Sequence, residues 1–267
     1  MILFPPAKIN LGLNILGKRE DGYHDIESCM YAIPLRDVLE ILPSEEVRFL
    51  QTGMPVNGDE ADNLVMKAFQ LLQSRYAIPN VYIHLQKNIP MGAGLGGGSA
   101  DATYTLLGLN ELFKLNLSIE VLQSLATELG SDCPFFVVNQ PQLVKGRGEV
   151  LSPINLDLEG YYLKIINPGI HIGTAEAYSN VEYAEVAGSL ETILLKSPEY
   201  WKNNLINGFE KSVFKKYPQI RELKEQLYAE GALYASMTGS GSTVFGIFKN
   251  FPESSDKEPF AFVCCLD

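Results

Sequence analysis

The segment KNIPMGAGLGGGS, residues Lys87 to Ser99, has the clearest capacity for chemistry in this chain. Five of the seven positions from Gly92 to Gly98 are glycine, strand-like sequence precedes them and a helical pattern follows. Glycine lets consecutive backbone N–H groups converge on one anion, and a helix N-terminus adds partial positive charge. The segment therefore predicts a phosphate-binding loop, and the alternative is a flexible loop or a site of close backbone packing.

Two well-known nucleotide motifs match this loop incompletely. Gly92, Gly94 and Gly97 satisfy GxGxxG, but helical sequence stands where a dinucleotide-binding fold needs a strand that ends in an acidic residue. The P-loop pattern fails because Gly98 occupies the position of its lysine. A phosphate site of neither class is the main prediction, and a dinucleotide-dependent oxidoreductase is a minor alternative.

The composition excludes several classes of binding partner and site. The chain has 267 residues and a net charge of −11, which disfavours nucleic acid and anionic membranes as partners. No apolar run approaches the roughly 20 residues of a membrane span, and no basic segment precedes the apolar residues 1–7. The four cysteines show no CxxC spacing, which disfavours zinc. We expect a cytoplasmic protein with reduced, partly buried thiols.

Hydrophobic periodicity predicts a mixed α+β chain in two lobes, residues 1–150 and 151–267. Residues 9–15 alternate, with Lys8, Asn10 and Asn14 on the polar face. Asp62 or Asn63 is a candidate helix cap, and Gly130 a candidate helix end. Helices are predicted at 64–76, 99–113, 118–129, 191–195, 204–213 and 220–230, and further strands at 38–42, 47–51, 81–85, 161–166, 233–237 and 243–248. We assign no role to the tail, residues 251–267.

PMGAGLGGGSADA at residues 90–102 resembles the ATP-binding motif of the GHMP kinases. Other segments resemble, in the same order, members of that family that act on a cytidine-linked alcohol: PPAKINLGLNILGKREDGYHDIES at 5–28, DNLV at 62–65, GSDCPFF at 130–136, the turn at 146–149, NPGIHIGT at 167–174 and MTGSGSTVFG at 237–246. The resemblance implies a two-lobed GHMP kinase fold with the active site in the interlobe cleft. It also implies ATP and Mg²⁺, and transfer of the γ-phosphate to the 2-hydroxyl of 4-diphosphocytidyl-2-C-methyl-D-erythritol, a step of non-mevalonate isoprenoid precursor biosynthesis.

The resemblance also implies roles for individual residues. Asp132 would accept or orient the hydroxyl proton, and Lys8 would keep Asp132 ionised and counter the transferring charge. Without the resemblance, a solvated strand lysine and a turn cap would be the simpler interpretations. Ser99 would contact Mg²⁺ or phosphate. The implied nucleotide contacts are Asn63, Lys87, Pro90, Met91, Gly92, Ala93, Gly94, Leu95, Gly96, Gly97, Gly98, Ser99 and Ala100.

For the substrate, Tyr23 would stack on the cytosine and His24 would read its edge. Tyr178 is a candidate for the second stacking face, although related enzymes often carry Phe there and a core role is equally compatible. The remaining implied substrate contacts are Asn10, Gly239 and Ser240. A GHMP kinase for another alcohol, of homoserine or mevalonate type, and a non-catalytic nucleotide-binding protein are alternatives.

Overall fold

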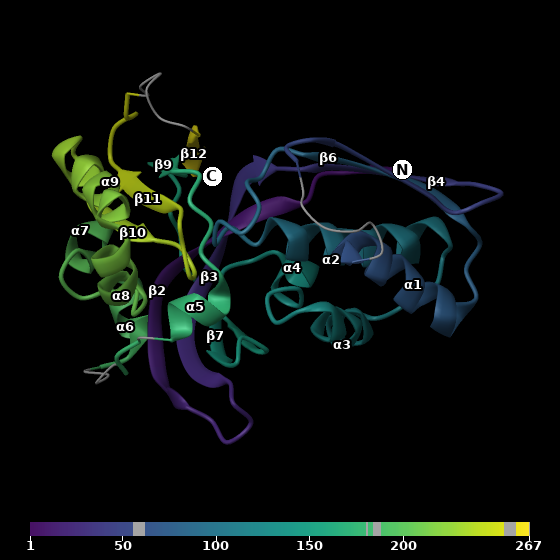
Figure 1. The fold of residues 1–267 in the computed structure, drawn as a ribbon, viewed down its shortest axis with the longest axis horizontal. Helices are drawn as coiled ribbons and strands as arrows, with labels where there is room; N and C mark the ends of the chain where they lie inside the picture. Colours follow the sequence, from purple (N-terminus) through teal and green to yellow (C-terminus); the bar gives the residue numbers. More distant parts are fainter. Residues whose placement is uncertain (56–61, 180, 184–187, 254–259, 267) are drawn as a thin grey trace. The chain divides into compact units, whose positions relative to one another are not determined.

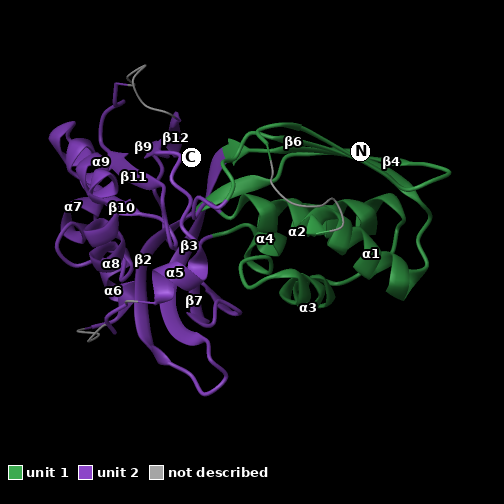
Figure 2. Ribbon diagram, viewed as in Figure 1, with its two compact units in different colours: residues 1–8, 35–91, 96–140 green, residues 9–34, 92–95, 141–267 purple. Residues whose placement is uncertain are grey.

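A computed structural model describes residues 1–55, 62–179, 181–183, 188–253 and 260–266 (Figure 1). They form two compact units (Figure 2). Unit 1 comprises residues 1–8, 35–91 and 96–140, and unit 2 comprises 9–34, 92–95 and 141–267. Neither unit is one continuous stretch of chain. The predicted sequence domains, 1–150 and 151–267, are continuous stretches, so their boundary stays a prediction.

Unit 1 is a four-stranded sheet with helices packed on it. The strand order is β1-β4-β6-β5, and only the β5–β6 pair is parallel. Inward side chains of β4 and β6, such as Ile41 and Ile83, form one buried core with Phe69 of α1 and Leu106 of α2. The elements are β1 (Ile2–Leu3), β4 (Val38–Pro43), β5 (Arg48–Gly53), α1 (Leu64–Tyr76), β6 (Val81–Lys87), α2 (Gly97–Leu112), α3 (Ile119–Leu129) and α4 (Phe135–Val138).

Unit 2 contains an antiparallel sheet of order β10-β11-β9-β12, and α9 contacts β10 and β11. A further sheet has the order β2-β3-β7-β8, and the first residues of its strand β2 belong to unit 1. The elements are β2 (Pro6–Lys18), β3 (His24–Arg36), β7 (Gln142–Gly146), β8 (Val150–Pro153), β9 (Tyr161–Ile166), α5 (Thr174–Tyr178), α6 (Leu190–Leu194), α7 (Pro198–Trp201), α8 (Glu210–Lys216), α9 (Pro218–Ala229), β10 (Tyr234–Met237), β11 (Val244–Phe248) and β12 (Ala261–Leu266).

The strongly periodic segments fold as predicted, which confirms the α+β class. Helix α1 spans residues 64–76, and the side chain of Asn63 caps it by accepting from the backbone N–H of Val65 at 2.9 Å. Ser118 caps α3, which ends at Gly130. Strand β9 also has the predicted bounds, 161–166. Local pattern and capping chemistry are sufficient to define these elements.

The predicted helix over 204–213 is wrong, because α8 begins only at Glu210. The side chain of Asn207 donates to the carbonyl oxygens of Met237 at 2.7 Å and Gly239 at 2.9 Å, and it accepts from the backbone N–H of Phe209. Residue 207 also bridges Leu13 of β2. These tertiary bonds compete with helix formation and override the local pattern.

Two other expectations are corrected. The tail contributes strand β12, which pairs with β9 through residues 261–266. The expected polar face of β2 is largely covered, since Lys8 and Asn10 are only 3% and 2% exposed. Their hydrogen-bonding groups therefore need partners within the protein.

Among the described residues, no helix is both long enough and apolar enough to cross a membrane. Cys29 and Cys133 are buried. Burial raises the pKa of the Cys29 thiol to about 12 and that of Cys133 to about 11. Both thiols are therefore protonated and poorly nucleophilic at neutral pH, as expected for structural cysteines.

Candidate active site

Lys8 and Asp132 lie together in unit 1, as the sequence predicts. The Lys8 Nζ is 3.3 Å from Asp132 Oδ2, and the lysine side chain is 4% exposed whereas the aspartate side chain is 33% exposed. An ammonium removed from water interacts strongly with an adjacent anion. The pair therefore combines a buried cation with a carboxylate that solvent, or a hydroxyl group, can reach.

The N-terminus of α2 approaches the same lysine. Gly96 caps this helix in the left-handed conformation, with φ of +71°, and no side chain caps the first turn. A Cβ atom at Gly96 would lie 3.0 Å from Lys8 Cγ and 3.1 Å from Phe136 Cζ. The glycine thus permits both the turn and the close approach, and no side chain of the protein caps the first-turn amides of this helix.

The first half of the glycine loop, residues 92–95, belongs to unit 2 and packs against residues 238–243. Gly94 O accepts the Thr238 hydroxyl at 3.1 Å, and Ala93 O accepts the backbone N–H of Thr243 at 3.3 Å. Gly94 has φ of +78°, and a Cβ there would lie 2.1 Å from Thr238 O. Close backbone packing therefore explains part of this glycine cluster, alongside its predicted phosphate contacts.

Asn10 is buried in the same part of unit 2. Its Nδ2 donates to Ser28 Oγ at 2.9 Å, and its backbone N–H donates to Thr238 Oγ1 at 3.0 Å. Ser28 in turn donates to Gly12 O at 2.6 Å. Thr238, which the sequence analysis did not single out, therefore links Asn10 to the glycine loop. The buried Gly239 and the half-buried Ser240 follow it directly.

The predicted cytidine-binding residues are also in unit 2. The His24 and Tyr178 rings are stacked, with centroids 4.4 Å apart and an angle of 16° between their planes. Tyr178 also meets Phe209 edge-on at 4.8 Å. Tyr23 is 56% exposed, and the Arg147 guanidinium lies 4.8 Å from its ring centre. Sequence reasoning missed Arg147, which lies in the turn between β7 and β8.

Lys87, which the resemblance implies as a nucleotide contact, lies in an unexpected environment. Its side chain is fully buried in unit 1 and donates to Asp37 and, at 2.6 Å, to Asp101. Burial opposes the charge of Lys87, but the charges of Asp101 and Asp37 raise its pKa overall. Its predicted contact with a nucleotide stays a prediction.

Asp101 is expected to make the free energy of unfolding pH-dependent. Burial raises its pKa to about 8, from 3.8 in the unfolded chain, despite the opposing charge of Lys87. Between these two values the folded state binds one proton more than the unfolded state, so stability falls as pH rises. This contribution is fully present below pH 3.8 and is lost as pH passes through about 8.

Asp101→Asn cannot release this proton, so its melting temperature should fall less steeply than that of the wild type between about pH 5 and 8.5. Thermal melts across this range measure the difference. Asp157→Asn, at an exposed position, is the matched control and should follow the wild type. If the melting temperatures of Asp101→Asn and the wild type changed with pH in parallel, the pH dependence would not arise from Asp101.

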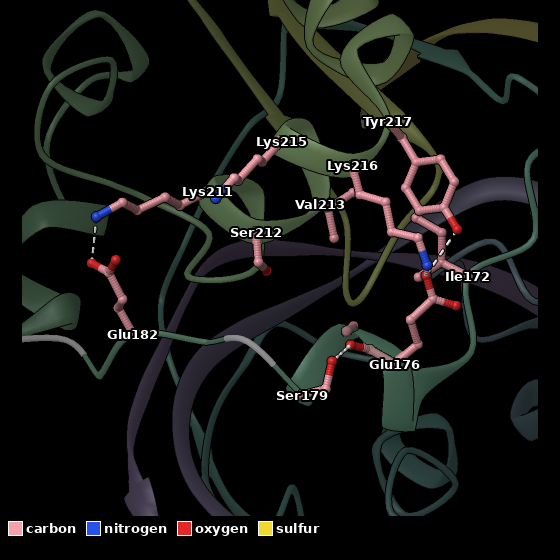
Figure 3. A pocket seen from close by; sticks show the side chains of 11 residues that line it. Ile172, Glu176, Ser179, Glu182, Lys211, Ser212, Val213, Lys215, Lys216 and Tyr217 are labelled. Carbon is pink, nitrogen blue, oxygen red and sulfur yellow. Dashed lines mark hydrogen bonds and ion pairs between the residues drawn. The ribbon is translucent and has the colours of Figure 1, made fainter.

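A cavity of about 600 Å³ in unit 2 contains none of the predicted site residues (Figure 3). Five of the polar side chains that line it are already paired with one another. Lys216 Nζ and the Tyr217 hydroxyl donate to Glu176 at 2.6 and 2.8 Å, and Lys211 pairs with Glu182 at 2.5 Å. We therefore place the candidate site at the residues described above and not at this cavity.

Comparison with known proteins decides the family. Residues 63–140 match the model of the GHMP kinase N-terminal domain, and residues 186–258 match that of the C-terminal domain. A protein of Azobacteroides pseudotrichonymphae named 4-diphosphocytidyl-2-C-methyl-D-erythritol kinase is 51% identical over 93% of this chain and 94% of its own. The chain belongs to the GHMP kinase family. It is an ATP-dependent small-molecule kinase, which confirms the predicted enzyme class.

Further relatives and structures agree with this membership. A Cytophaga hutchinsonii protein of the same name is 47% identical over 100% of this chain and 99% of its own. The crystal structure of 4-(cytidine 5'-diphospho)-2C-methyl-D-erythritol kinase is 31% identical, with a TM-score of 0.80 over 92% of this chain and 90% of that one. The mevalonate kinase of Methanococcus jannaschii, 15% identical with a TM-score of 0.69 over 100% and 98%, shares the fold alone. The GHMP kinase fold is thereby confirmed.

Proposed function

We propose that this kinase transfers the γ-phosphate of ATP to the 2-hydroxyl of 4-diphosphocytidyl-2-C-methyl-D-erythritol, giving ADP and the 2-phosphate in non-mevalonate isoprenoid precursor biosynthesis. The observation that carries the proposal is the Lys8–Asp132 pair, 3.3 Å apart beside the N-terminus of α2. The names of the relatives support the identity of the substrate. ATP and the nucleotide-linked alcohol are cytoplasmic metabolites, so we propose that location.

The backbone amides of the glycine loop and the first turn of α2 would bind the phosphates of ATP. The uncapped first turn, with left-handed Gly96 before it, supports this role. Asn63 lies at the N-terminus of α1, where its side chain also holds the backbone N–H of Val65. Its Nδ2 is 3.4 Å from Gln51 Oε1, a weak bond that a nucleotide could replace.

Asp132 would accept or orient the proton of the attacking hydroxyl, since its carboxylate is accessible. Lys8 would orient this carboxylate and counter the charge on the transferring phosphoryl group. Phosphoryl transfer depends mainly on positioning and charge stabilisation, so a fixed cation and an oriented carboxylate are the principal requirements.

Mg²⁺ fits this site as an ion held mainly by phosphate. The described residues contain no group of three His, Cys, Asp or Glu side chains placed to bind a metal. Mg²⁺ retains water and takes few protein ligands when it binds with phosphates. Half-buried Ser99, in the first turn of α2, offers one hydroxyl oxygen. The bound ion would neutralise charge on the β- and γ-phosphates.

A coupled assay of ADP release across a panel of alcohols tests the proposal. The panel comprises the cytidylyl methylerythritol, homoserine, mevalonate and phosphomevalonate. We expect turnover with the first and at most trace turnover with the others. Turnover only with another member of the panel would assign the enzyme to that alcohol. Nicotinamide cofactor that raises the melting temperature, with no effect of ATP, would contradict the kinase proposal.

Tyr23→Ala is expected to raise KM for the cytidylyl substrate roughly 5- to 150-fold, because base stacking on an aromatic ring contributes about 1–3 kcal/mol. KM for ATP should not change. Tyr200→Ala removes another exposed tyrosine, which is 45% accessible, and serves as the control in steady-state kinetics. Equal KM values for Tyr23→Ala and Tyr200→Ala would exclude Tyr23 as a base contact.

A further inference from the structure

Three ionisable side chains are buried together in unit 1. Asp37 is 0% exposed, Lys87 1% and Asp101 2%. They come from three places in the chain, namely the β3–β4 junction, the last residue of β6 and the second turn of α2. Buried ion pairs cost desolvation free energy and often stabilise less than apolar packing would. A contribution to stability alone therefore does not account for these buried groups.

The first aspartate fixes the chain where it leaves β6. Asp37 Oδ1 accepts the backbone N–H groups of Asn88 at 2.5 Å and Ile89 at 2.9 Å. The Asn88 side chain donates to Arg36 O at 3.0 Å. Two successive amides and one side chain thus hold the entry to the glycine loop.

Lys87 connects this entry to helix α2. Its Nζ donates to Asp37 Oδ2 and to Asp101 Oδ2, the latter at 2.6 Å. Gly97, the first residue of α2, packs directly on this group, since a Cβ there would lie 2.9 Å from Ile89 Cγ2 and 3.3 Å from Lys87 Nζ. The same two hydrogen bonds of Lys87 therefore hold both the segment before the loop and the helix after it.

We propose that Asp37, Lys87 and Asp101 form a positioning network that orients the first turn of α2 for phosphate binding. This inference rests on the proposed ATP site. In place of the predicted direct contact with the nucleotide, Lys87 acts through the backbone, because its ammonium is enclosed by two aspartate side chains and would have to leave both to reach a ligand. Amides that bind one phosphate must keep their geometry closely. For a group in an active site, a displacement of about 1 Å can lower the reaction rate about 100-fold.

Lys87→Met tests the network. We expect Kd for ADP and the inhibition constant of inorganic tripolyphosphate to rise by the same factor, about 10- to 100-fold. KM for the alcohol should not change, and KM for ATP should change more than kcat. Titration calorimetry and competition kinetics measure these constants. Lys164→Met is the matched control, because it removes another buried lysine, paired with Glu230 at 2.9 Å in unit 2.

Two other outcomes would contradict the proposed positioning role of the network. Weaker ADP binding with unchanged tripolyphosphate inhibition would make Lys87 a nucleoside contact. A lower melting temperature, as in Lys164→Met, with both constants unchanged would make it purely structural. If Lys87→Met does not fold, Asp37→Asn serves instead, since its carbonyl oxygen can still accept the two amides while the link to Lys87 is lost. Wild-type protein that neither turns over nor binds ADP would refute the proposed function itself, and the network with it.

Discussion

Asp132→Asn is expected to lower kcat by about 10²- to 10⁴-fold, the range in which positioned acid–base groups contribute. The amide has nearly the same shape as the carboxylate but cannot accept the hydroxyl proton. It also removes the negative partner of Lys8, whose Nζ lies 3.3 Å away. Kd for ATP should change little, because the amides that we propose to bind phosphate belong to the glycine loop and α2. Steady-state kinetics and calorimetry measure the two effects separately.

Asp157→Asn makes the same chemical change at an exposed position and should retain wild-type kcat. A fall in kcat of less than tenfold for Asp132→Asn would exclude Asp132 as the group that handles the proton. Loss of ATP binding together with turnover would instead point to a local change of structure at α4. The variant is therefore informative only when both constants are measured.

Gly94→Ala is expected to destabilise the protein by at least about 2 kcal/mol. Its φ of +78° costs a residue with a Cβ roughly 1–2 kcal/mol, and that Cβ would lie 2.1 Å from the carbonyl oxygen of Thr238. The contact is with backbone, so no side chain can rotate to relieve it. A change of this size should lower Tm by roughly 5 °C or more. Loop displacement should also weaken binding of ATP.

Gly98→Ala is the matched control for stability, because among the described residues its Cβ would meet Leu64 and Met91, both at the ordinary distance of 3.8 Å. Gly98 lies within α2, where alanine is a better helix former than glycine. We therefore expect no loss of Tm in this variant. Equal melting temperatures for Gly94→Ala and Gly98→Ala would contradict the inferred packing of residues 92–95.

The parts of the fold that local sequence determines could be predicted well. Helix α1 carries its own cap, Asn63, and its apolar spacing defines the rest. The elements that were predicted wrongly or not at all depend on partners distant in sequence. Asn207 prevents an earlier start of α8 through bonds to residues 237 and 239, and β12 forms only by pairing with β9. No local pattern contains this information.

The features of the candidate site also fall into those that could be predicted from sequence and those that could not. The motifs placed Lys8 and Asp132 in one site, and the structure brings these side chains together. The surroundings of Lys87 could not be read from sequence, since Asp37 is the single residue between β3 and β4 and Asp101 lies in a helix. Thr238 and Arg147 likewise acquire their roles from residues distant in sequence. Side-chain identity is local, whereas burial and pairing arise only when the chain is folded.

The packing of residues 92–95 on residues 238–243 has a consequence for synthesis on the ribosome. Gly94 and Ala93 are synthesised long before their partners Thr238 and Thr243, since Thr238 follows Gly94 by 144 residues. The helix that follows the loop can form long before then. The loop itself gains these contacts only after residues 238–243 have been synthesised. Chains released before residue 243 should therefore remain without kinase activity, however much of unit 1 has already folded.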